Sequence, residues 1–181
     1  KPRVGERPCV LYCDIEENVR GWGGRLSLDW AFSETALAYA SFSRGFKSGA
    51  FDTRALAAFA GNADQPVGPE FLDAWELGFK STSEDATLEI NGALFYYAWE
   101  DLQTFAVDGT GAPAFLNVPE TELMGAELET KWAPGAGWYV QGGIGYNKSE
   151  ITDAGTINTV KEGGVLAHTP ELTASALVRK E

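Results

Sequence analysis

Two carboxylates, Glu127 and Glu129, stand two residues apart in the stretch AELET and are candidates for acid–base chemistry. A carboxylate pair can supply a general acid and a general base when the two groups differ in pKa. The same spacing places both side chains on one face of a β-strand, where a hydrated surface carries carboxylates without catalysis. We therefore interpret this pair as part of a water-facing wall.

His168, in LAHTPE, is the single histidine of the chain and the other residue with catalytic chemistry. A serine–histidine enzyme needs partners whose proximity the spacing does not show. We interpret His168 as a residue at the entry of a strand and predict that the chain is not an enzyme. A membrane lipase built on a barrel stays an alternative.

The two cysteines, Cys9 and Cys13, lie close together in CVLYC. Without a nearby histidine or further cysteines they make a poor metal site. We favour a local disulfide formed in an oxidising compartment, and the pairing itself stays open. The sequence predicts neither a metal nor a cofactor.

Composition narrows the class of protein. The net charge is −12, which argues against a nucleic-acid partner because no basic surface is available. No run approaches the roughly 18 apolar residues that a transmembrane helix needs. Twenty-one glycines, 10 phenylalanines, six tyrosines and six tryptophans favour strands and tight turns.

Apolar and polar residues alternate with the period of two that is typical of strands. This pattern predicts seven strands, Gly23–Ala31, Ala36–Phe46, Phe71–Ser81, Thr87–Phe105, Thr121–Trp132, Trp138–Glu150 and Glu171–Lys180. The nearest helical candidate is the short piece Thr53–Ala60.

The connections predict how these strands are joined. The short turns FSET, TSEDA and APGAG alternate with three long connections, Lys47–Glu70, Ala106–Glu120 and Ile151–Pro170. This order predicts an antiparallel up-and-down meander with tight turns at one rim and long loops at the other. Outer-membrane barrels are built in this way.

The faces of the strands decide between a soluble and a membrane sheet. In WELGFK, Trp75, Leu77 and Phe79 share one face, while Glu76 and Lys80 share the other. A lysine on a lipid face costs roughly 2–4 kcal/mol at the membrane midplane, so the charged faces must line the lumen of a membrane barrel. Aromatic residues beside the short turns favour a membrane girdle, and a soluble β-sandwich stays the minority alternative.

Five segments together resemble a known family. They are LAYASFSRGFKSGAF, PEFLDAWELGFKS, LEINGALFYYAWEDLQTF, NVPETELMGAELETKW and GWYVQGGIGYNKSEI, in this order. The chain from about Gly23 to Lys180 resembles the C-terminal half of the barrel of TonB-dependent outer-membrane receptors.

This resemblance implies a function and a domain organisation. Such receptors resemble one another in a barrel of about 22 strands that is closed by a plug domain. They take up scarce nutrients such as siderophore-bound iron, cobalamin or glycans with energy delivered through the TonB protein. We expect residues 1–22 to form an extracellular loop segment and residues 23–181 to form a partial barrel, without plug or remaining strands. A small complete outer-membrane barrel, acting as an adhesin or structural protein, is the alternative.

The resemblance also suggests roles for single residues in a bacterial outer membrane. Its partners would be membrane lipid, the receptor's own plug domain, TonB and a small-molecule ligand. Four residues of the long loops are candidate ligand contacts, Lys47, Phe51, Phe59 and Phe115. Seven residues are candidates for the lumen wall, Arg44, Glu76, Lys80, Glu89, Asn91, Glu127 and Glu129.

Overall fold

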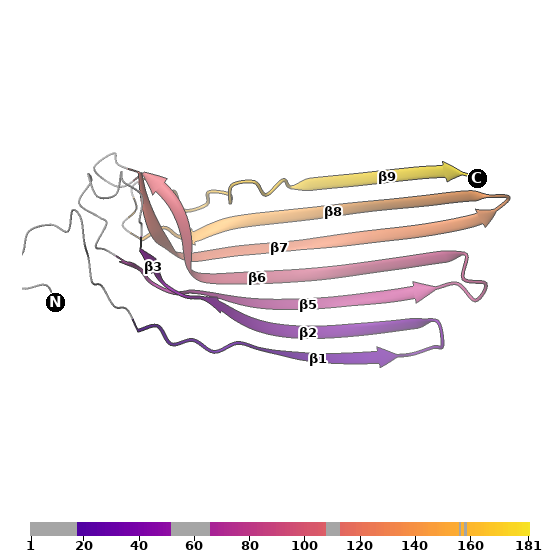
Figure 1. Cartoon of the computed structure of the whole chain (residues 1–181), viewed down its shortest axis with the longest axis horizontal. Helices are drawn as coiled ribbons and strands as arrows, with labels where there is room; N and C mark the ends of the chain where they lie inside the picture. Colours follow the sequence, from indigo (N-terminus) through magenta and orange to yellow (C-terminus); the bar gives the residue numbers. More distant parts are fainter. Residues whose placement is uncertain (1–17, 52–65, 108–112, 156, 158) are drawn as a thin grey trace, which may run out of the picture.

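The structure is a computed structural model that describes residues 18–51, 66–107, 113–155, 157 and 159–181 (Figure 1). Cys9, Cys13, Phe59 and the candidate helix Thr53–Ala60 lie outside the described residues. No helix in the described part of the chain is long and apolar enough to cross a membrane.

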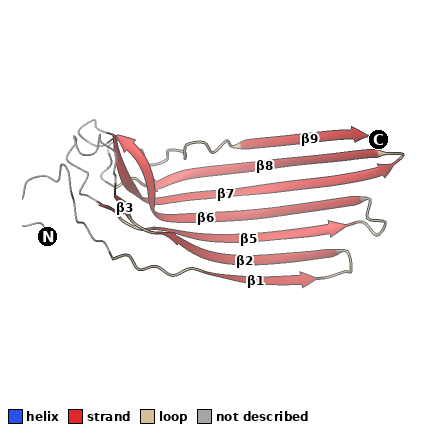
Figure 2. Ribbon diagram, in the orientation of Figure 1, coloured by secondary structure: helices blue, strands red, loops and turns tan. Residues whose placement is uncertain are grey.

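A single antiparallel sheet of seven strands makes up most of the described chain (Figure 2). Its strands follow the order β1-β2-β5-β6-β7-β8-β9, so strands that are neighbours along the chain also pair in the sheet. Their bounds are β1 Gly24–Ala31, β2 Ala36–Lys47, β5 Glu70–Thr82, β6 Leu88–Val107, β7 Pro113–Gly135, β8 Trp138–Asp153 and β9 Leu172–Lys180. A second sheet pairs β3 (Ala50–Phe51) with β4 (Pro66–Val67) inside the connection between β2 and β5.

The predicted fold class is confirmed, because the seven strands form an antiparallel up-and-down meander. The three short turns lie together at one end of the sheet, and the long connections lie at the other (Figure 1). We call these the turn end and the loop end. Six of the seven predicted strands begin within one residue of their observed start.

The remaining strand, β7, is longer than predicted. β7 begins at Pro113 rather than Thr121, so residues 113–120 of the expected long connection Ala106–Glu120 instead pair with β6 in the upper part of a tall hairpin. Pro113 and Pro119 are unusual positions within a strand, because proline lacks the N–H that a strand ladder uses. The pairing skips Pro119 and the opposite residue Asp101, which has a φ of 56°, and then resumes at Leu102 and Val118.

The few buried residues gather at the loop end. Four of the five buried apolar residues, Val67, Ala114, Val118 and Ala154, belong to the tall hairpin or to the neighbouring connections. The sheet itself has open faces because it is one layer thick along most of its length (Figure 2). Side-chain packing therefore orders the loop end, while backbone pairing orders the sheet.

The turn between β5 and β6 is organised by one carboxylate. Asp85 Oδ1 accepts hydrogen bonds from Ser83 Oγ at 2.6 Å and from the Thr87 backbone N at 3.1 Å. A third bond comes from Thr87 Oγ1 at 2.9 Å. These hydrogen bonds hold the pKa of the Asp85 carboxyl below its usual range, and the bond from Ser83 has the largest effect.

We predict that this turn loosens in acid. A carboxyl whose pKa is lowered on folding stabilises the fold above its unfolded pKa of about 4, and the contribution is lost as the pH falls through the folded pKa. Hydrogen exchange of the Thr87 amide, measured as a protection factor in the full-length receptor, should drop below about pH 4. An Asp85→Ala variant should lack this step, and a step of equal size in that variant would contradict the prediction.

Candidate functional site

One face of the seven-stranded sheet carries most of the predicted lumen residues. We call it the polar face and define it by Tyr39, Lys80, Asn91, Glu127 and Glu129. Lys80 pairs with Asn91, which in turn pairs with Glu129 in the next register, so the three lie in one row across β5, β6 and β7. The row beside it runs from Tyr39 through Gly78 and Ala93 to Glu127.

The remaining predicted residues of this face follow from the same alternation. Glu76 lies two residues before Gly78 on β5, and Glu89 pairs with Lys131 one row closer to the turn end. Six of the seven candidates for the lumen wall are thus brought to one face. Whether this face lines a lumen stays a prediction.

The prediction that Arg44 shares this face is wrong. Arg44 pairs with Asp73 on β5, whereas the polar-face row pairs Tyr39 with Gly78, so Arg44 is an odd number of residues from Tyr39 and points to the opposite face. Its Nη1 lies 2.6 Å from Asp73 Oδ2, and its Nη2 lies 3.6 Å from Glu100 Oε2. The sequence argument selected Arg44 for its charge, whereas the period of two sets its face.

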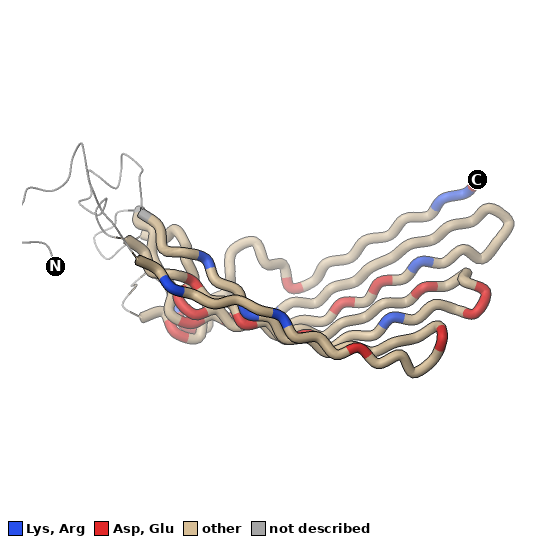
Figure 3. The backbone as a smooth tube through the Cα atoms, turned by 60° about the horizontal axis from the view of Figure 1, so that its bottom comes forward, with Lys and Arg blue, Asp and Glu red and all other residues tan. Residues whose placement is uncertain are grey.

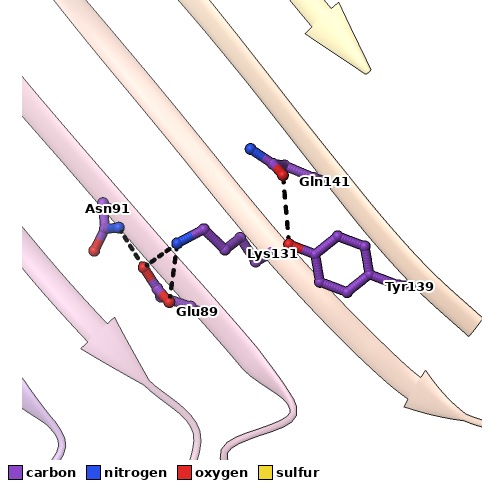
Figure 4. Close-up of polar contacts among 5 residues, drawn as sticks. All are labelled: Glu89, Asn91, Lys131, Tyr139 and Gln141. Carbon is purple, nitrogen blue, oxygen red and sulfur yellow. Dashed lines mark hydrogen bonds and ion pairs between the residues drawn. The ribbon is translucent and has the colours of Figure 1, made fainter. Parts of the chain in front are cut away.

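Charged and polar side chains bond to one another near the turn end of the polar face (Figure 4). Glu89 Oε1 accepts hydrogen bonds from Asn91 Nδ2 at 2.8 Å and from Lys131 Nζ at 3.2 Å. On β8, Tyr139 OH donates to Gln141 Oε1 at 3.4 Å. Lys131, Tyr139 and Gln141 were missed as site residues. The alternation along β7 places Lys131 on the same face as Glu127 and Glu129, and Gln141 on β8 pairs with Lys131.

Tyr39 also lies on the polar face, although as an aromatic residue beside a short turn it was expected in the membrane girdle. Its hydroxyl donates a hydrogen bond of 2.6 Å to Glu76 Oε1, and Lys80 Nζ lies 5.7 Å from the centre of its ring. The ring lies over Gly78, its direct register partner, because a Cβ built on Gly78 would fall 2.5 Å from Tyr39 Cε1. Glycine at position 78 therefore makes room for the tyrosine.

Glu127 and Glu129 stand apart from these bonded groups. Both side chains are exposed, and neither has a hydrogen bond or an ion pair within the part of the chain that the structure describes. Hollows of about 200 Å³ and 210 Å³ flank the pair. Small residues contribute to both hollows, with Gly92 and Ala93 on one side and Gly143 and Gly145 on the other. The pair thus forms an accessible anionic ridge.

The opposite face is apolar along the middle of the sheet. We define this apolar face by Leu28, Leu77, Leu94, Leu128 and Ile144. Leu28 is 73% exposed and Leu94 is 58% exposed, which is far more than a soluble core would leave open. Toward the loop end the apolar face carries an aromatic row in which Trp75 lies 5.2 Å from Phe42 and 5.5 Å from Tyr96, measured between ring centres.

Charge gathers beyond that aromatic row. Figure 3 shows acidic and basic residues together at the loop end and acidic residues again in the β1–β2 and β5–β6 turns. Arg44, with its guanidinium carbon 5.2 Å from the ring centres of both Trp22 and Phe71, lies one register row beyond Phe42 and Trp75. The apolar face is therefore bounded by aromatic and then charged residues.

Two of the four candidate ligand contacts meet at the loop end. Lys47 Nζ lies 5.8 Å from the ring centre of Phe115, and that ring lies 4.6 Å from the ring centre of Phe105. Phe51 belongs to β3, but its side chain, like Phe59, lies outside the described residues. Phe105 was not predicted, since it was read as the last residue of a strand.

A family model described as TonB dependent receptor-like, beta-barrel matches residues 14–179. The chain belongs to this family. Members are β-barrels of the bacterial outer membrane, which agrees with a sheet whose two faces differ in polarity. They are receptors and transporters, which confirms the prediction that the chain is not an enzyme. No match was found among the curated proteins.

Solved structures of this family share the fold. The ferric yersiniabactin uptake receptor FyuA from Yersinia pestis aligns with a TM-score of 0.70 at 21% identity, over 86% of this chain and 22% of that receptor. The siderophore receptor PiuA from Acinetobacter baumannii gives 0.66 at 20% identity, over 86% and 23%. The copper transporter OprC gives 0.67 at 16% identity, over 88% and 24%. The chain thus spans about a quarter of the length of these receptors.

We predict that the Tyr39–Gly78 contact contributes to the stability of the receptor barrel. In Gly78→Ala the new methyl group displaces the Tyr39 ring from its bond to Glu76, and overpacking of this kind costs roughly 1–3 kcal/mol. Gly45→Ala is the matched control, because nothing lies within 4 Å of a Cβ built on Gly45. Denaturant unfolding of both variants in the full-length receptor measures the difference, and equal stability of the two would contradict this contact.

Proposed function

We propose that this chain is part of the wall of an outer-membrane receptor for energised uptake of a scarce nutrient, of the siderophore-iron, cobalamin or glycan class. The observation that carries the proposal is the two-faced sheet, which has an apolar face bounded by aromatic residues and a polar face with accessible carboxylates. Residues 23–181 would form the wall, and residues 1–22 an extracellular segment beside it.

The apolar face would contact membrane lipid. The hydrocarbon core of a bilayer is about 30 Å thick, and strands of 20 and 23 residues rise much farther than that at ~3.3 Å per residue. The upper parts of β6 and β7 would therefore stand above the membrane. Their position at the loop end supports an extracellular location for the long connections (Figure 1).

The polar face would contact the receptor's own plug domain. Glu127 and Glu129 are exposed, and the hollows beside them are large enough for side chains of a partner. An exposed carboxylate on an otherwise bonded wall is suited to a cationic group. TonB would then act on that plug and not on this sheet, which forms a fixed part of the barrel wall.

The loop end would contribute to ligand binding. Lys47 supplies a cation and Phe115 an aromatic surface from two different connections. FyuA is a ferric yersiniabactin uptake receptor and PiuA is a siderophore receptor, which supports testing ferric siderophores first. OprC is a copper transporter with the same fold, so the fold by itself does not fix the cargo.

We predict that the full-length receptor binds one class among ferric siderophores, cobalamin and oligosaccharides. Lys47→Gln and Phe115→Ala should each weaken that binding by about tenfold, as expected when one contact of roughly 1.4 kcal/mol is lost. Lys161→Gln, in the connection between β8 and β9, is the matched control and should bind as the unaltered receptor does. Titration calorimetry measures the constants, and failure to bind any of the three classes would overturn the proposed cargo.

We also predict that arginine is tolerated on one face and not on the other. Leu94→Arg should lower the stability of the folded receptor by roughly 2–4 kcal/mol near the membrane midplane, while Asn91→Arg should have little effect. The two residues lie on opposite faces of β6. Folding yield in lipid vesicles, followed by heat-dependent gel mobility, compares them. Equal loss for both variants would mean that the apolar face does not meet lipid.

A further inference from the structure

Gln103 fastens the tall hairpin to the connection between β2 and β5. The side-chain nitrogen of Gln103, on β6, donates to the backbone oxygen of Ser48 at 2.9 Å and to that of Gly68 at 3.0 Å. Ser48 directly follows β2, and Gly68 lies two residues before β5. One amide group thus holds the chain both where it leaves the sheet and where it returns.

Asn117, the register partner of Gln103 on β7, holds the same place from a second side. Its Oδ1 accepts the Gly68 N–H at 2.7 Å, and its Nδ2 donates to the Gly68 oxygen at 3.1 Å. This amide therefore pairs with both backbone groups of one residue, as a neighbouring strand would. Its Nδ2 also donates to the Asp101 oxygen at 2.7 Å, across the gap in the β6–β7 pairing.

The backbone of Gln103 completes the arrangement, because its N–H donates to Glu70 Oε2 at 2.9 Å. Gln103 is 8% exposed, so its side chain is removed from water. A buried amide that loses its partners leaves polar groups unsatisfied, which makes substitution here costly in the local structure. We call Gln103 and Asn117, with their bonds to Ser48, Gly68 and Glu70, the amide clasp.

The clasp lies directly beside the candidate ligand contacts. Lys47 precedes Ser48 in the chain, and Phe115 lies two residues before Asn117 on β7. The clasp bonds therefore fix the segment that carries Lys47 relative to the strand that carries Phe115, whose ring lies 5.8 Å from Lys47 Nζ. Neither Lys47 nor Phe115 is needed for these bonds.

We propose that Gln103 and Asn117 are positioning residues that lock the base of the β2–β5 connection to the β6–β7 hairpin, so that Lys47 and Phe115 form one site. The role of that site in ligand binding rests on the proposed function, whereas the lock itself does not. Ligand specificity would then depend on residues that a ligand never touches.

The positioning role of the amide clasp is tested by hydrogen exchange of the full-length receptor in detergent. The Gln103→Ala/Asn117→Ala double variant should exchange the amides of residues 48–51 and of Val67, Gly68 and Glu70 about tenfold faster or more, since the Gly68 amide loses its acceptor. Gln103→Glu is the conservative variant, because it keeps the shape of the side chain but turns a carboxylate toward two carbonyl oxygens. It should give the same change. Gln141→Ala, another amide on the sheet, is the matched control.

A distance measurement separates positioning from general stability. Nitroxide labels at Ala50 on β3 and Ala106 on β6 should give a narrow distance distribution by pulsed EPR, and a broad one in the double variant and in Gln103→Glu. Unfolding of the barrel and exchange in β8 and β9 should stay as in the unaltered receptor. A defect in ligand binding that accompanies intact exchange would point to the proposed function alone.

Local loosening confined to residues 48–51 and 66–70, with a broadened distance, supports the lock. Unchanged exchange in the double variant would overturn it. So would loosening that spreads through the whole β6–β7 hairpin, since Gln103 and Asn117 would then be ordinary packing residues of that hairpin.

Discussion

Alternation along each strand is the constraint on which this structure depends. A strand points successive side chains to opposite faces. In a sheet one layer thick, each strand must therefore suit a different environment on each of its two faces. Leu77 and Glu76 are neighbours in the chain, yet they lie on the apolar and the polar face. A shift of register by one residue would move every side chain of a strand to the opposite face. The cross-strand pairs and short turns that fix register therefore matter more here than a hydrophobic core.

Side-chain packing is concentrated where the sheet meets its connections, among the described residues. Val118 is 2% exposed and Thr121 is 1% exposed, close to the buried Ser149, whose hydroxyl oxygen accepts the Leu166 N–H at 3.0 Å. Thr159 Oγ1 also donates to the Val107 oxygen. The β8–β9 connection is thus tied to the same hairpin as the β2–β5 connection.

The sequence was sufficient for the strands and for most of the faces, because both follow from a local period of two. It failed at Pro113–Glu120, which was read as part of a long connection, although β7 pairs with β6 there on both sides of a gap at Pro119. It misplaced Arg44 because charge was preferred to alternation. Gln103 and Asn117 carried no local signal, since their partners lie 35 and 49 residues away at Gly68, and only the folded chain brings them together.

The contact between Tyr39 and Gly78 has a consequence for how such walls change during evolution. The ring occupies the volume that a side chain at position 78 would need. A larger residue at 78 is thus compatible only with a smaller residue at 39, so that the two positions should covary among related barrels. Phe79 over Gly92 and Phe95 over Gly125 repeat the arrangement in direct register pairs. Covariation of aromatic and glycine residues would then record strand pairing itself, even where overall identity is low.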